Sequence, residues 1–247
     1  MHRLDSSRAW DTDSQRSFWN SWIAGNLSLT TPREDAFRTA QRLRTMIEAL
    51  CLSSSATILE VGCANGWFTE ILTAYGQITG IDLADSAVEQ ARQRVPAANF
   101  YCGDFNHHPF AERSFDLVVS LETFSHIDQT TFLERFSTLL KPGGHLLLTT
   151  QNRYVYLRQV WITPPAEGQV RPWVTTRQLK RMVRQRFDVK ACFTVEPSGH
   201  LGLLRIVNSR KLNALPCSLF GADRIKRLKE FLGLGQTIVL LARNRAA

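Results

Sequence analysis

Residues 58–72 of the chain read ILEVGCANGWFTEIL, and the rest of the sequence is best understood outward from them. Ile58, Leu59 and Val61 form a short apolar run typical of a buried strand, and apolar residues resume at helical spacing from Trp67. Between the two lies a turn of small residues, which lets a ligand approach the unpaired backbone N–H groups of a helix start. The stretch predicts a strand, a ligand-binding turn and a helix.

The glycine spacing of this turn excludes two common nucleotide loops. A P-loop requires Lys and then Ser or Thr after its second glycine, but Trp67 and Phe68 follow Gly66. A dinucleotide loop of the form GxGxxG requires a small residue where Trp67 stands, because the helix must pack closely against the strand there. The pattern that remains is E-x-G-x-x-x-G, formed by Glu60, Gly62 and Gly66.

This pattern resembles the first motif of class I S-adenosylmethionine-dependent methyltransferases, an acidic residue, one further residue and then GxGxG. Ala64 replaces the middle glycine and keeps that position small. The resemblance implies an α/β fold: a doubly wound, Rossmann-like, seven-stranded sheet, mostly parallel with the last strand antiparallel, and helices on both faces. It implies S-adenosyl-L-methionine as cofactor and S-adenosyl-L-homocysteine as product. The cofactor contacts expected from this turn are Glu60, Gly62, Cys63, Ala64 and Gly66.

Two further acidic residues fit the same family. Residues 77–83 predict a second strand that ends at Asp82, about 20 residues beyond Gly62, where a doubly wound sheet brings the second strand beside the first loop. A carboxylate there can accept both ribose hydroxyl protons, and Leu83, which follows it, is also an expected cofactor contact. Residues 99–102 predict a third strand before Gly103, Asp104 and Phe105. The resemblance places Asp104 on the adenine amine and Phe105 beside the ring.

Two more strands complete the core pattern. Residues 114–121, SFDLVVSL, predict a fourth buried strand, and Ser120 and Leu121 at its end are expected to contact the cofactor. Residues 139–150, LLKPGGHLLLTT, predict the end of a helix, a turn and a fifth strand. A KPGG turn before a strand is common in this methyltransferase class, so the resemblance covers residues 58–150.

His126 is the candidate general base, because it follows the fourth strand and histidine titrates near neutral pH. Glu122, four residues earlier, is expected to share a helical face with His126 and to orient its imidazole. Two alternatives stay open: a histidine bonded to nearby backbone, and a Glu122 that contacts the methionine end of the cofactor. The ubiquinone-pathway O-methyltransferases carry ExxEH with a metal here, but Ser125 replaces the second acid, so no metal is expected.

The segments that flank this core are predicted to cover the site. Residues 1–52 are interpreted as an N-terminal helical lid and first helix, and residues 53–247 as the methyltransferase core. The first segment crowds Trp10, Phe18, Trp19 and Trp22 together. These aromatics indicate either a helix packed on the core or a lid over the cofactor, and Trp19 is the expected cofactor contact.

Beyond the fifth strand, residues 151–175 are interpreted as a substrate cap and residues 197–234 as an insertion between the last two strands. The insertion is expected to shape the substrate pocket or to form an oligomer contact. The sequence after residue 150 resembles the STxNR segment of the ubiquinone-pathway enzymes. The candidate substrate contacts in these two segments are Asn152, Arg153, Tyr154 and His200.

Composition is that of a globular domain. The 247 residues are 44% hydrophobic and 21% charged, and they contain no apolar run long enough to span a membrane. The N-terminal residues are too polar for a signal peptide. Five cysteines without a CxxC pair argue against a disulfide framework or a zinc site. These features predict a cytoplasmic protein, and a homodimer is compatible with them.

Charge is divided unevenly along the chain. Residues 1–149 carry 12 Lys and Arg against 17 Asp and Glu, whereas residues 150–247 carry 18 against 5. A basic half can bind nucleic acid or an anionic membrane, or surround an anionic substrate. Nucleic acid is disfavoured, because Ser120-Leu-Glu-Thr123 lacks both the [ND]PP[YF] motif of exocyclic-amine methylases and the cysteine nucleophile of base-C5 methylases.

The sequence therefore predicts a methyltransferase acting on an oxygen, or a nitrogen, of a small aromatic or heteroaromatic molecule. Transfer is expected to be an in-line displacement that needs a base for a hydroxyl acceptor, whereas a neutral amine needs only positioning. The alternatives are an RNA methyltransferase, a quinone or lipid methyltransferase at a membrane surface, and a non-catalytic cofactor-binding subunit.

Overall fold

The computed structural model describes residues 12–25, 34–163, 169 and 171–245. Its centre is a seven-stranded sheet of order β3-β2-β1-β4-β5-β7-β6, in which β7 is antiparallel to both neighbours and the other pairs are parallel. The strands are β1 (Thr57–Val61), β2 (Gln77–Asp82), β3 (Asn99–Cys102), β4 (Phe115–Leu121), β5 (Leu140–Gln151), β6 (Phe187–Pro197) and β7 (Gly235–Asn244). The predicted doubly wound sheet is confirmed.

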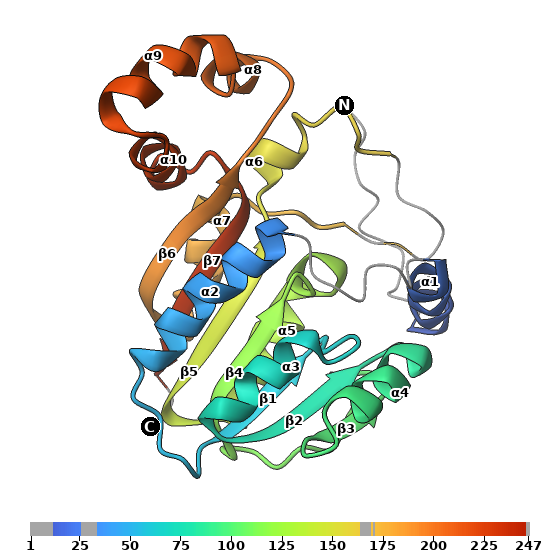
Figure 1. Cartoon of the computed structure of the whole chain (residues 1–247). Helices are drawn as coiled ribbons and strands as arrows, with labels where there is room; N and C mark the ends of the chain where they lie inside the picture. The colour runs from blue at the N-terminus through green and yellow to red at the C-terminus, as the bar shows by residue number, and fades with distance from the viewer. Residues whose placement is uncertain (1–11, 26–33, 164–168, 170, 246–247) are drawn as a thin grey trace.

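Helices cover both faces of this sheet (Figure 1). One face packs against α2 (Glu34–Glu48), α3 (Trp67–Leu72) and α4 (Asp85–Arg94), the other against α5 (Gln129–Leu139) and α7 (Thr176–Val183). Each face of the sheet has its own apolar core, because successive side chains of a strand point to opposite faces. In β1, for example, Ile58 packs with the α2 and α3 core and Leu59 with the α5 and α7 core.

The KPGG segment forms a bulge inside a strand and not a turn before one. Leu140 pairs with Phe115, but the next paired residue of β5 is His145, opposite Leu117. Gly143 takes φ +74° within the bulge, where a Cβ would lie 2.8 Å from the Arg243 guanidinium. The expected fifth strand is present. It begins at Leu140, before Gly143 and Gly144, because pairing with β4 occurs on both sides of the bulge.

The flanking segments add helices at the edges of the sheet. They are α1 (Thr12–Gly25), α6 (Arg153–Tyr156), α8 (Leu203–Val207), α9 (Arg210–Phe220) and α10 (Ala222–Phe231), with short 3-10 turns η2 (Thr73–Tyr75) and η3 (Phe124–His126). The last three α-helices form the insertion between β6 and β7 and project beyond the ends of those strands (Figure 1). Trp10 of the predicted lid lies outside the described residues. Within the described part of the chain, no helix is both long and apolar enough to cross a bilayer.

Candidate functional site

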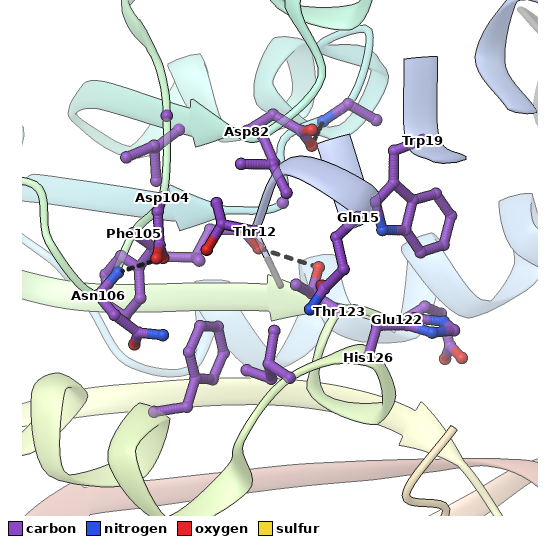
Figure 2. A pocket seen from close by; sticks show the side chains of 18 of the residues that line it. Thr12, Gln15, Trp19, Asp82, Asp104, Phe105, Asn106, Glu122, Thr123 and His126 are labelled. Atoms are coloured by element: carbon purple, nitrogen blue, oxygen red, sulfur yellow. Dashed lines mark hydrogen bonds between the residues drawn. The ribbon is translucent and has the colours of Figure 1, made fainter. Parts of the chain in front are cut away.

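A cavity of about 590 Å³ lies at the carboxyl ends of β1 to β5, within the roughly 300–1,000 Å³ range of small-molecule sites. This is the edge at which open α/β sheets bind their ligands. Helix α1 contributes part of its wall (Figure 2). The predicted residues that line it are Trp19, Gly62, Ala64, Asp82, Leu83, Gly103, Asp104, Phe105, Leu121, Glu122 and His126.

The turn after β1 has a backbone that only glycine fits at its first position. Gly62 takes φ +78°, and a Cβ there would lie 1.9 Å from Oγ1 of Thr123. That hydroxyl donates to the carbonyl oxygens of Val61 and Leu121, at 3.3 Å each, so it closes the gap between the ends of β1 and β4. Gly66 takes φ +76° at the start of α3, where a Cβ would approach the Ala91 backbone at 3.1 Å.

Asp82 ties the turn to the end of β2. Its carboxylate accepts hydrogen bonds from the backbone N–H groups of Ala64 and Ala84, each at 2.9 Å. Burial raises the pKa of Asp82, and these two donors oppose the rise. Because each carboxylate oxygen can accept more than one hydrogen bond, Asp82 can also accept from two vicinal hydroxyl groups in the cavity.

The segment after β3 presents a second carboxylate beside an aromatic ring. Asp104 accepts from the Asn106 N–H at 2.9 Å and contacts Nδ1 of His107 at 2.7 Å. Phe105 stacks edge-on against Phe132, with ring centroids 4.9 Å apart, and is only 5% exposed. The ring therefore belongs to the core and to the cavity wall, and it gives the wall an apolar face beside Asp104.

Helix α1 runs over the cavity from Thr12, near Asp104, to Trp19, near His126 (Figure 2). The Trp19 indole meets the His126 imidazole edge-on, with ring centroids 4.9 Å apart. One turn of the same helix is fastened to the start of α4, because Asn20 donates to Asp85 at 3.3 Å and accepts from the Ser86 hydroxyl at 3.3 Å. Helix α1 thus bridges α4 and the segment that carries His126.

Glu122 does not share a helical face with His126, which corrects the expectation from their spacing. It takes φ +58° directly after β4, whereas His126 ends the separate 3-10 turn η3. The N–H of Glu122 donates to the carbonyl and hydroxyl oxygens of Thr149, at 3.1 Å each. Burial raises the pKa of Glu122 to about 7. Both residues line the cavity, so each has its own access to a ligand.

Four predicted cofactor residues lie behind the wall of the cavity. Glu60 is 2% exposed and accepts from the Thr69 hydroxyl, and burial raises its pKa to about 8. Cys63 is 2% exposed and Ser120 is fully buried. These three side chains and the backbone of Gly66 shape the turn and the strand ends. Direct contact of the four residues with a cofactor stays a prediction.

The predicted substrate residues lie apart from the cavity lining. Asn152 is 1% exposed and holds the fold together: it caps α6 through the Tyr154 N–H, and its amide donates to the carbonyl oxygens of Gly233 and Gly235 at 3.0 and 2.9 Å. Its contact with a substrate stays a prediction. The Tyr154 ring lies under the Arg158 guanidinium at 4.2 Å. Arg153 and His200 are exposed. Any substrate contact of Arg153, Tyr154 and His200 would have to come from outside this cavity.

Several cavity residues escape sequence reasoning. Gln151 ends β5 and accepts from the Ser125 hydroxyl; the rule that ligands bind at strand ends could have identified it. Thr12 and Gln15 are ordinary polar residues of α1, and nothing in their sequence context marks them. Among the described residues, no group of three His, Cys, Asp or Glu side chains is placed to hold a metal ion.

Comparison with known proteins agrees with this geometry. Residues 59–148 match the methyltransferase-domain family. A ubiquinone biosynthesis O-methyltransferase of Coxiella burnetii is 31% identical over 102 residues, which are 39% of this chain and 44% of the relative. A phthiotriol/phenolphthiotriol dimycocerosates methyltransferase of Mycobacterium ulcerans is 32% identical over 126 residues, or 48% and 44% of the two chains. The chain thus spans less than half the length of these relatives.

Solved structures share the fold over nearly the whole chain. A methyltransferase in complex with the Trm112 activator of Haloferax volcanii matches with a TM-score of 0.64 and 18% identity, over 95% of this chain and 99% of that one. Geranyl diphosphate C-methyltransferase of Streptomyces coelicolor, with S-adenosyl-L-homocysteine bound, gives 0.59 and 14%, over 95% and 98%. Residues 59–148 thus match a methyltransferase domain, and the described chain shares the fold of these solved methyltransferase structures, one of which holds S-adenosyl-L-homocysteine.

Proposed function

We propose that this protein methylates an oxygen, or a nitrogen, of a small aromatic or heteroaromatic molecule. The observation that carries the proposal is one shared cavity. Its wall joins the Gly62 turn and the two carboxylates, Asp82 and Asp104, to Trp19 and His126 on the opposite side. A donor held at the first group of residues would present its reactive end toward the second.

The Gly62 turn, the two carboxylates and Phe105 can together hold the cofactor. The two carboxylates can accept from the ribose hydroxyls and the adenine amine, and Phe105 offers an apolar surface to the ring. Gly62 lines the cavity with backbone alone, so a ligand can approach the turn closely there. S-adenosylmethionine supplies a sulfonium methyl group for in-line displacement, so the protein's main task is to position the acceptor and exclude water.

Two residues of the opposite wall can handle the proton of a hydroxyl acceptor. His126 brings an imidazole to the cavity wall, and Glu122 has a pKa of about 7, which suits a group that takes up a proton near neutral pH. Apolar side chains, including Trp22, Ile23 and Ile127, line the same cavity and would contact an aromatic ring.

The test measures binding and turnover separately. S-adenosylmethionine is titrated into the protein by calorimetry, with Asp82→Asn as a variant expected to bind at least about tenfold more weakly, because it replaces a charged acceptor by a neutral amide. Release of S-adenosylhomocysteine is then followed with phenolic, heteroaromatic and amine acceptors. Cofactor binding without turnover on any acceptor would favour a non-catalytic subunit, and absence of binding would overturn the proposal.

A further inference from the structure

The insertion carries an apolar surface that the rest of the described chain leaves open. Six of its side chains, which we call the insertion surface, are each at least 60% exposed. They are Leu203, Leu212, Leu215, Leu219, Phe231 and Leu232. Isolated exposed apolar side chains are ordinary, but a cluster on consecutive helices marks an interaction site.

The outward orientation of this surface is fixed by contacts on its inner side. Glu230 of α10 is 4% exposed, and its carboxylate accepts from the Arg42 guanidinium of α2 at 2.7 Å. The next residue, Phe231, is 85% exposed, so the helix points it away from the sheet. The backbone oxygen of Glu230 also accepts from the buried Thr194 hydroxyl of β6 at 2.7 Å. The helix therefore cannot turn its apolar face inward without breaking these bonds.

Helix α9 also has an apolar face that points to solvent. Leu212, Leu215 and Leu219 recur at intervals of three and four, so they form one stripe along the helix. All three are at least 61% exposed. In an ordinary surface helix the apolar stripe packs on the core, and here it faces solvent. A surface of this kind requires something to cover it.

The insertion is basic as well as apolar, and its charge favours one class of partner for this surface. Residues 197–234 contain seven Lys and Arg against two Asp and Glu. One of the two acids, Glu230, is buried in its ion pair, which leaves Asp223 as the exposed acid. Arg205, Lys211, Arg224 and Arg227 are exposed on the same three helices as the apolar side chains. Basic and apolar side chains together are the composition of helices that lie in the headgroup region of an anionic membrane.

We propose that the insertion surface docks on an anionic lipid bilayer. The leucine and phenylalanine side chains enter the interface, and the arginine and lysine side chains meet the lipid phosphates. A second copy of the chain fits the surface less well, because a two-fold contact would bring the same basic residues against one another. A bilayer also needs no complementary shape, which suits side chains spread over three short helices.

The neighbouring cap segment extends this surface. Leu157, Val160 and Trp161 are at least 53% exposed. The N–H of His200 donates to the carbonyl of Arg158 at 2.8 Å, which holds the cap beside the start of the insertion. The insertion follows the carboxyl end of β6, so it projects from the same edge of the sheet that holds the cavity (Figure 1). Docking there would place that edge toward the membrane.

Vesicle sedimentation tests the proposal with the full chain. Native protein is expected to bind vesicles that contain phosphatidylglycerol, to bind phosphatidylcholine vesicles at least about tenfold more weakly, and to be released by salt. The double variant Leu215→Ser/Leu219→Ser and the double variant Arg224→Glu/Arg227→Glu are each expected to lower partitioning about tenfold or more. These positions are exposed, so both variants should fold.

The matched control is Arg177→Glu/Arg181→Glu, which makes the same change of charge at two exposed positions of α7. It is expected to keep most of the vesicle binding, which would assign the effect to the insertion and not to net charge. No binding by native protein, or equal binding by all variants, would overturn the proposal. So would a native dimer that does not bind vesicles and that Leu215→Ser/Leu219→Ser dissociates. Cofactor affinity of the variants, measured separately, shows that the catalytic domain is intact.

Discussion

The indole of Trp19 stands edge-on against the imidazole of His126, with ring centroids 4.9 Å apart and ring planes at 76°. This contact joins α1 to the segment after β4 across the mouth of the cavity. Edge-to-face pairs contribute about 0.5–1.5 kcal/mol beyond their buried area. We expect Trp19→Ala to weaken S-adenosylmethionine binding by roughly three- to tenfold, measured by calorimetry, because it removes part of the wall and loosens α1.

Trp19→Phe tests whether the aromatic contact with His126, which holds α1 in place, is what the alanine variant loses. It keeps an aromatic ring opposite His126, so it should retain most of the affinity, within about threefold of the native protein. If Trp19→Ala and the native protein bind the cofactor equally well, α1 does not close the site.

His126→Ala is expected to lower kcat by about 10²–10⁴-fold, the usual contribution of a general base, with cofactor affinity changed less than about threefold. The reason is position: His126 lines the cavity on the side opposite Asp82 and Asp104, so it faces the acceptor end. Steady-state kinetics with a phenolic acceptor and calorimetry with S-adenosylmethionine give the two numbers. An unchanged kcat would remove His126 from the chemistry and leave Glu122 as the candidate base.

Gly62→Ala is expected to abolish measurable cofactor binding. A Cβ at this position would lie 1.9 Å from Oγ1 of Thr123 and would also have to accept φ +78°, so the turn or the end of β4 must move. Gly202→Ala is the matched control, since Gly202 also has a left-handed φ of +58° but a Cβ added there would meet no atom within 4 Å. It should lose stability, on the order of 1–3 kcal/mol, because φ +58° with ψ −141° is a conformation that side chains other than glycine rarely adopt, and it should keep its affinity. Equal affinity of Gly62→Ala and Gly202→Ala would contradict the clash argument.

The sequence predicts those parts of the fold and site that local patterns and topology determine together. The strands alternate or run apolar, and parallel strands end at one edge, so Gly62, Asp82 and Asp104 can be placed together without a structure. The Trp19 and His126 contact depends on how α1 lies, which no local pattern encodes. Helical spacing misplaces Glu122, because its positive φ breaks the helix that such spacing assumes.

Asn152 shows the same limit at longer range. Its resemblance to a family segment predicts a substrate contact, but its partners are the carbonyl oxygens of Gly233 and Gly235, more than 80 positions further along the chain. An asparagine side chain satisfies whichever backbone groups the fold brings to it, and sequence alone does not say which these are. The exposed stripe of α9 is similar, because its periodicity predicts a helix and not the direction that the stripe faces.

Glu60 should make the protein less stable as pH rises. Its pKa is about 8 in the folded chain against an ordinary value of 4.5, because burial disfavours the charged form. Below pH 4.5 both states carry the proton and the contribution of Glu60 to stability is fully present. Between about 4.5 and 8 the unfolded chain loses the proton while the folded chain keeps it, so the free energy of unfolding falls, by at most about 1.4 kcal/mol per pH unit.

Glu60→Gln removes this titration. The amide oxygen can still accept from the Thr69 hydroxyl, so the variant should fold, and its free energy of unfolding should depend less on pH between about 5 and 8. Urea unfolding at a series of pH values measures the slope. Glu122→Gln is the comparison, because Glu122 titrates in the same window with a pKa of about 7 and its replacement leaves the Glu60 contribution in place. A slope in Glu60→Gln as steep as in the native protein would show that the buried carboxyl is ionised at neutral pH, and α3 would then be held to β1 by a charged hydrogen bond.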